Sequence, residues 1–105
     1  LAAERQLLAG QLVQARAEVS AAAQRALAYG TEILPHFEAS LTLLRRSFEL
    51  GDIDILALST GRERFLRMQS DALMAQQDYF IALANLERVV GVDLWHDDHH
   101  EGDAP

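Results

Sequence analysis

The stretch SFELGDIDILAL, residues 47–58, decides the fold, because it places one turn signal between two long helical patterns. Gly51 can adopt the left-handed backbone conformation that follows the last residue of a helix. Asp52 or Asp54 can then cap the next helix with a side-chain oxygen. The stretch therefore predicts a tight turn at residues 50–54.

Apolar residues recur at alternating spacings of three and four on both sides of this turn, which is the pattern of a coiled-coil seam. The first seam consists of Leu8, Leu12, Ala15, Val19, Ala22, Ala26, Tyr29, Ile33, Phe37, Leu41, Leu44 and Phe48. The second seam consists of Leu58, Gly61, Phe65, Met68, Ala72, Ala75, Tyr79, Ala82, Leu86 and Val89. We predict an all-α fold in which a helix at about residues 2–50 and a helix at about residues 53–90 form a long antiparallel two-helix coiled-coil hairpin within residues 1–94.

One irregularity interrupts the first seam. Its residues follow one another at spacings of four at Tyr29, Ile33, Phe37 and Leu41. Such a stutter locally unwinds a left-handed supercoil. Pro35 lies at the same place, where it removes an amide donor and crowds the preceding turn. We therefore expect the first helix to bend or straighten at residues 30–35.

The composition argues against several classes of function. Nine arginines without any lysine stand against 16 acids, and the net charge of −7 leaves no basic surface for a nucleic-acid partner. No apolar run approaches the roughly 18 residues of a membrane helix, and the absence of cysteine excludes thiolate chemistry. No metalloprotease, phosphate-loop or nucleophile motif occurs, so we do not expect an enzyme.

The C-terminal segment combines histidines with acids. His96, His99 and His100 lie among Asp97, Asp98 and Glu101. Imidazole nitrogens and carboxylate oxygens are ligands that Zn²⁺, Cu²⁺ and Ni²⁺ accept, but acidic polar segments are usually disordered. We predict a flexible acidic, histidine-rich tail at residues 95–105 that binds such metals weakly, and no other cofactor.

Four stretches resemble one protein family. They are YGTEILP at residues 29–35, the turn stretch at residues 47–58, YFIALA at residues 79–84 and LERVVG at residues 86–91. Together they resemble the C-terminal part of TolC-like outer-membrane efflux factors, in particular the heavy-metal and multidrug branch. The resemblance extends over nearly the whole chain up to Leu94.

The resemblance implies a passive conduit for the export of drugs or metal ions. Such proteins are trimers whose helical hairpins form a periplasmic tunnel beneath an outer-membrane β-barrel, and the tunnel tip meets a periplasmic adaptor and an inner-membrane pump. This chain would be one excised periplasmic hairpin, something like the last quarter of such a protein. The tip candidates are Phe48, Gly51, Asp52, Asp54 and Arg62.

The run at residues 57–62 departs from the family pattern, because Ala57 and Thr60 stand where acids are frequent. Simpler roles exist for the tip residues: Asp52 and Asp54 as helix caps, Arg62 as a solvated surface residue and Phe48 as a seam residue. Thr60 with Glu63 also matches a capping box. Since the second seam continues without a change of phase, a continuous helix is favoured there.

Two other functions remain open. A periplasmic adaptor (membrane-fusion protein) also ends in a two-helix tip, which carries a series of an arginine, a leucine and a hydroxyl residue. In this chain Arg62 and Leu66 correspond to the arginine and the leucine, and the hydroxyl residue has no convincing counterpart. A generic coiled-coil oligomerisation module is the third possibility. Apolar residues also lie off the seams, at Leu34, Leu43, Leu66, Leu73, Phe80 and Leu83. They predict that the isolated chain forms a dimer or a larger bundle.

Overall fold

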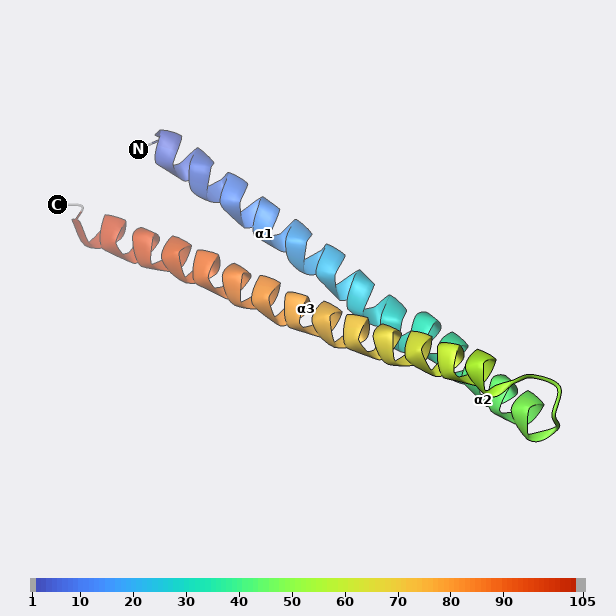
Figure 1. Ribbon diagram of the computed structural model, residues 1–105. Helices are drawn as coiled ribbons and strands as arrows, with labels where there is room; N and C mark the ends of the chain where they lie inside the picture. The colour runs from blue at the N-terminus through green and yellow to red at the C-terminus, as the bar shows by residue number, and fades with distance from the viewer. Residues whose placement is uncertain (1, 104–105) are drawn as a thin grey trace. The chain divides into compact units, whose positions relative to one another are not determined.

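The computed structural model describes the backbone of residues 2–103 and the side chains of residues 2–95. Over this part the chain is almost entirely helical and contains no strand. Its elements are α1 (Ala2–Ala28), the π-helix η1 (Tyr29–Ile33), α2 (Leu34–Glu49) and α3 (Ile55–Asp103), as Figure 1 shows. The prediction of an all-α fold is confirmed.

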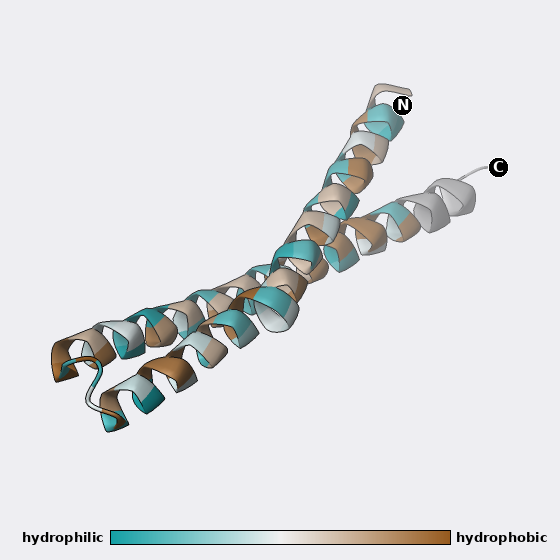
Figure 2. Ribbon diagram, turned by 90° about the vertical axis from the view of Figure 1, so that its right-hand side faces the viewer, coloured by the Kyte–Doolittle hydropathy of each residue, from teal (hydrophilic) through white to brown (hydrophobic). Residues whose placement is uncertain are grey.

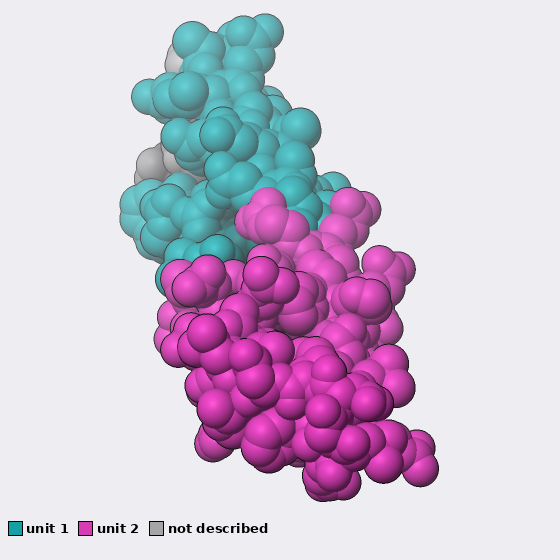
Figure 3. All heavy atoms as spheres, turned by 45° about the vertical axis from the view of Figure 1, so that its right-hand side comes forward, with its two compact units in different colours: residues 1–23, 78–105 teal, residues 24–77 magenta. Residues whose placement is uncertain are grey.

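The chain divides into two compact units, which Figure 3 distinguishes by colour. Unit 1 consists of residues 1–23 and 78–105, and unit 2 consists of residues 24–77. Unit 2 therefore contains the end of α1, all of η1 and α2, the turn and the beginning of α3. Unit 1 contains most of α1 and the remainder of α3.

The predicted seams form the covered side of the helices in each unit. Every seam residue is buried or half-buried except Phe48, which is 38% exposed. The best-covered apolar residues are Ala15, Ala22, Leu41, Ala75 and Val89. Figure 2 shows that hydrophobic and hydrophilic residues are interspersed along each helix. The spacing of apolar residues was therefore a correct guide to the core.

In unit 2 the core brings α2 close to α3. A Cβ atom at Gly61 of α3 would collide with the side chain of Leu44 of α2. Gly61 therefore leaves room for the Leu44 side chain, which would have to move if a larger residue replaced the glycine.

The turn between α2 and α3 has the geometry predicted for Gly51. Gly51 has a φ of 80° and is the one residue with positive φ in the described chain. The Gly51 N–H donates to the Phe48 carbonyl at 3.0 Å, and the Asp52 N–H donates to the Ser47 carbonyl at 2.8 Å. These two bonds form a Schellman motif, which satisfies the last carbonyl groups of α2.

The irregularity of the first seam takes the form of a π turn rather than a break. The Leu34 N–H donates to the Tyr29 carbonyl, five residues back, whereas an α-helix bonds four residues back. Pro35 follows directly, at the start of α2, and it has no N–H to donate to the turn before it. The expected disturbance at residues 30–35 is therefore located at η1.

The predicted end of the second helix is wrong. α3 continues through Gly91 to Asp103 instead of ending at about residue 90. Gly91 lacks the positive φ of a left-handed cap, so it continues the helix like any other residue. The flexible tail predicted from residue 95 falls partly on this helix, and the side chains of residues 96–105 lie outside the described part of the chain.

Candidate functional site

The turn and the helix ends beside it form the candidate functional site, which lies entirely in unit 2. We call it the tip and define it as residues 48–56 together with Arg62. Four of the five predicted tip residues, namely Phe48, Gly51, Asp52 and Asp54, lie in this continuous segment. Arg62 lies two turns into α3 and is exposed.

The two aspartates of the tip have different structural roles. The Ala57 N–H donates to Asp54 Oδ1 at 2.9 Å, so Asp54 is the N-cap of α3. Asp52 contributes its backbone N–H to the Schellman motif instead. Both aspartates are exposed. Capping, which the sequence allowed for either residue, is thus shown for Asp54.

Apolar side chains surround these aspartates on the surface of the tip. Leu50 and Leu56 are each 71% exposed, and Ile55 is 62% exposed. Phe48 is the seam residue that its neighbours cover least. The tip therefore combines exposed apolar side chains with two carboxylates.

Leu50, Ile55 and Leu56 were not singled out from the sequence. All three lie beside the turn and outside both seams. Their position outside the seam spacing is the signal that could have identified them, because a bulky apolar residue there does not lie on the line of contact between the helices.

The first turns of α3 after the tip are continuous. The Thr60 hydroxyl donates to the Leu56 carbonyl four residues back at 3.0 Å, which is the bond of a threonine inside a helix. The alternative in which Thr60 and Glu63 cap a new helix is therefore wrong. Arg62 follows on the same uninterrupted helix.

Each unit also carries an open groove. In unit 2 a groove of about 370 Å³ is lined by Ala26, Gly30, Leu34, Gln69, Ala72, Leu73 and Gln76. In unit 1 a smaller groove of about 190 Å³ is lined by Gln11, Gln14, Ala15, Glu18, Asn85, Arg88 and Val89. Four polar side chains of the smaller groove bond within their own helices, because Gln14 donates to Glu18 and Arg88 donates to Asn85.

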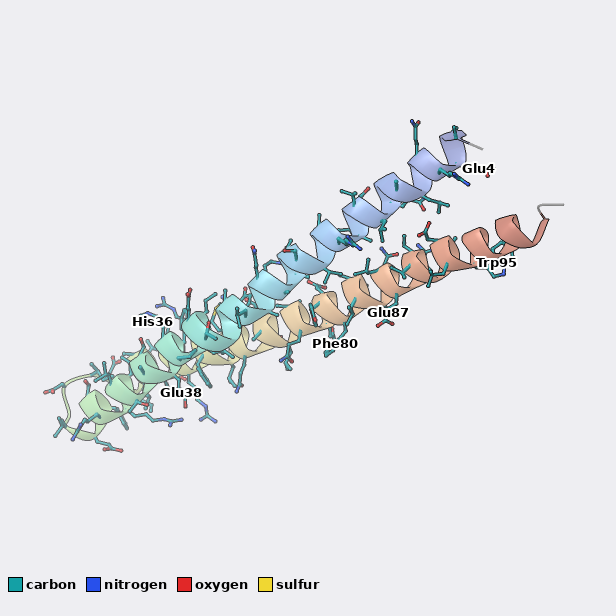
Figure 4. The ribbon with its side chains drawn as sticks, turned by 180° about the vertical axis from the view of Figure 1, so that it is seen from behind. Glu4, His36, Glu38, Phe80, Glu87 and Trp95 are labelled. Carbon is teal, nitrogen blue, oxygen red and sulfur yellow. The ribbon has the colours of Figure 1, made fainter. Side chains whose placement is uncertain are left out.

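The apolar residues predicted off the seams differ in their exposure. Leu43, Leu66, Leu73 and Phe80 are exposed, whereas Leu34 and Leu83 are half-buried. In Figure 4 the Phe80 side chain points away from its helix into the surroundings. The exposed residues add apolar surface away from the tip.

The metal prediction falls largely outside the described side chains. His96, His99 and His100 belong to the segment whose side chains are not described. Among the described residues no group of three or more His, Asp or Glu side chains is placed to hold a metal ion. His36 packs edge-on against Phe37, and Figure 4 shows it apart from Glu38.

None of the helices in the described part of the chain combines the length and apolar content needed to cross a membrane. Comparison of the chain with models of protein families, with curated proteins and with solved structures finds no match in any of the three.

Proposed function

We propose that the chain is a periplasmic hairpin of a TolC-like outer-membrane efflux channel, in which residues 48–56 and Arg62 form the tip that meets a periplasmic adaptor. The channel is a passive conduit, and drugs or metal ions are its cargo. The observation that carries the proposal is the tip itself, where a left-handed glycine turn holds exposed apolar side chains and two carboxylates between two seam-packed helices. The resemblance of four sequence stretches to the family supports the same reading.

We further propose that the helices on either side of the turn run antiparallel. Two contacts in unit 2 favour this arrangement. Leu44, six residues before Leu50, lies against Gly61, seven residues after Asp54. Farther from the turn, Ala26 and Leu34 line the same groove as Gln69 and Gln76. Segments at similar distances before and after the turn are therefore neighbours, as a hairpin requires.

In the intact protein the proposed partners are two further copies of the same protein, a periplasmic adaptor and an inner-membrane pump. The proposed location is the outer membrane, with this segment in the periplasm. The proposal includes no catalytic step and no resident cofactor. Weak binding of Zn²⁺, Cu²⁺ or Ni²⁺ by His96, His99 and His100 is a separate proposal.

The test is efflux by the intact protein in a strain that lacks its own channel. Leu50→Ser and Leu56→Ser remove apolar surface from the tip without disturbing the Schellman bonds, so resistance should fall while trimer assembly and membrane insertion persist. The matched control is Leu43→Ser, which removes an equally exposed leucine from the middle of α2. Equal resistance in tip and control variants would show that the tip does not dock an adaptor.

Fractionation separates the proposal from its two alternatives. An efflux channel should sediment with the outer membrane, an adaptor should remain with the inner membrane, and an oligomerisation module should have no effect on resistance at all. Recovery of the intact protein with the inner membrane would therefore favour the adaptor reading.

A further inference from the structure

The π turn η1 has a definite relation to the seam of unit 2. The interval from Tyr29 to Leu41 is one residue longer than the alternating spacing of the other seam residues allows. An α-helix turns by about 100° per residue, so this interval would place Leu41 about 120° around the helix from Tyr29. An interval one residue shorter would leave the two residues within about 20° of each other.

The seam nevertheless stays covered through this interval. Tyr29, Ile33 and Phe37 are half-buried, and Leu41 is 6% exposed. Gly30, between them, is exposed, and a Cβ atom there would meet nothing within 4 Å. The excess rotation must therefore be absorbed within the interval, and η1 is the part of it that departs from α-helical bonding.

We infer that η1 is a register adapter, a one-residue insertion that allows the residues before and after it to face α3 on the same seam. Its bond from Leu34 to Tyr29 encloses one more residue than an α-helical bond does. That extra residue equals the excess in the seam spacing. Without the adapter, either Ala26 and Tyr29 or Leu41 and Leu44 would turn away from α3.

Pro35 gives the adapter its place along the chain. In an uninterrupted α-helix its ring would crowd the carbonyl group of Thr31. The π turn directly before Pro35 changes the bonding of this preceding turn, because the Leu34 N–H reaches back to the Tyr29 carbonyl, five residues away. The proline thus explains where the π turn lies, and the seam explains why the chain needs one.

Single-residue deletions in the full chain test this inference, with thermal unfolding followed by circular dichroism. In a Pro35→Ala background, deletion of Gly30 removes the extra residue and restores the regular spacing. We expect its melting temperature to equal or exceed that of Pro35→Ala alone. Deletion of Ser70, an exposed residue in the regular part of the second seam, is the control and should lower the melting temperature by roughly 10 °C or more.

A further variant separates the two causes. Deletion of Gly30 with Pro35 retained forces the proline into a continuous α-helix, so it should melt below the same deletion in the Pro35→Ala background. The inference is overturned if deletion of Gly30 in the Pro35→Ala background is as damaging as deletion of Ser70. It is equally overturned if deletion of Ser70 has no effect, because the seam register would then be immaterial.

Discussion

Gly51 is the residue on which the turn depends most directly. Its φ of 80° lies in the left-handed region, where a side chain brings Cβ too close to the backbone. The space around it is open, since a Cβ atom at this position would contact nothing within 4 Å. The requirement for glycine is therefore purely conformational.

Replacement of Gly51 by alanine should lower the free energy of unfolding by about 1 kcal/mol, because alanine disfavours positive φ. The measurement is chemical denaturation of both proteins. Gly10→Ala serves as the control, since Gly10 lies inside α1 with open space around it, and alanine there should raise the free energy of unfolding by up to about 1 kcal/mol. If Gly51→Ala and Gly10→Ala changed the free energy of unfolding in the same direction, the role assigned to Gly51 in the turn would be contradicted.

Asp54 contributes through its side chain, whereas Asp52 contributes through its backbone. Asp54→Ala should lower the free energy of unfolding by about 1 kcal/mol, because the Ala57 N–H loses its capping oxygen. Asp54→Asn should retain most of the stability, since an amide oxygen also caps. If Asp52→Ala lowers the free energy of unfolding as much as Asp54→Ala does, the cap is not the source of the effect.

At the scale of whole elements, Gly51 and Gly91 show what the sequence could and could not predict. Both glycines follow apolar residues, and the two helices were predicted to end directly before them, at about residues 50 and 90. Gly51 is followed by Asp52 and by the capping residue Asp54, so a second signal marks its turn. Gly91 is followed by Val92, Asp93 and Leu94, and α3 continues through all of them. A glycine alone did not determine the end of a helix.

The seam predicted burial well, and it also located the disturbance at η1. The form of that disturbance could not be derived, because a bend, a straightened segment and a π turn all accommodate the same change of spacing. For the tip, the cap and the glycine turn followed from residue type. The exposed surface of Leu50 and Leu56 did not, because it depends on which sides of the helices face each other.

Gly91→Ala tests the continuity of α3. If Gly91 is an interior helical residue, alanine should increase the magnitude of the negative ellipticity at 222 nm and raise the free energy of unfolding by up to about 1 kcal/mol. If Gly91 were a left-handed cap, the same substitution would lower both quantities. A smaller magnitude of this negative ellipticity would therefore restore the predicted helix end at about residue 90.

At the scale of the whole molecule, the exposed apolar residues are expected to drive self-association. Leu73 is 62% exposed, and Leu66 is 52% exposed, so each retains apolar surface that another copy could cover. Sedimentation equilibrium of the 105-residue chain should give a dissociation constant of about 1 mM or tighter. Leu66→Ser with Leu73→Ser should weaken association, and Ser70→Ala is the control. A strictly monomeric parent chain would contradict this expectation.

The small side chains at the centre of the seams have a calorimetric consequence. Three of the five best-covered apolar residues, Ala15, Ala22 and Ala75, are alanines. Unfolding exposes little apolar area at each of them, and the heat capacity of unfolding rises with the apolar area exposed. We expect a heat capacity increment below the usual figure of about 12–15 cal/mol/K per residue. Its stability curve should accordingly be broad and flat, so that the chain loses little stability on cooling.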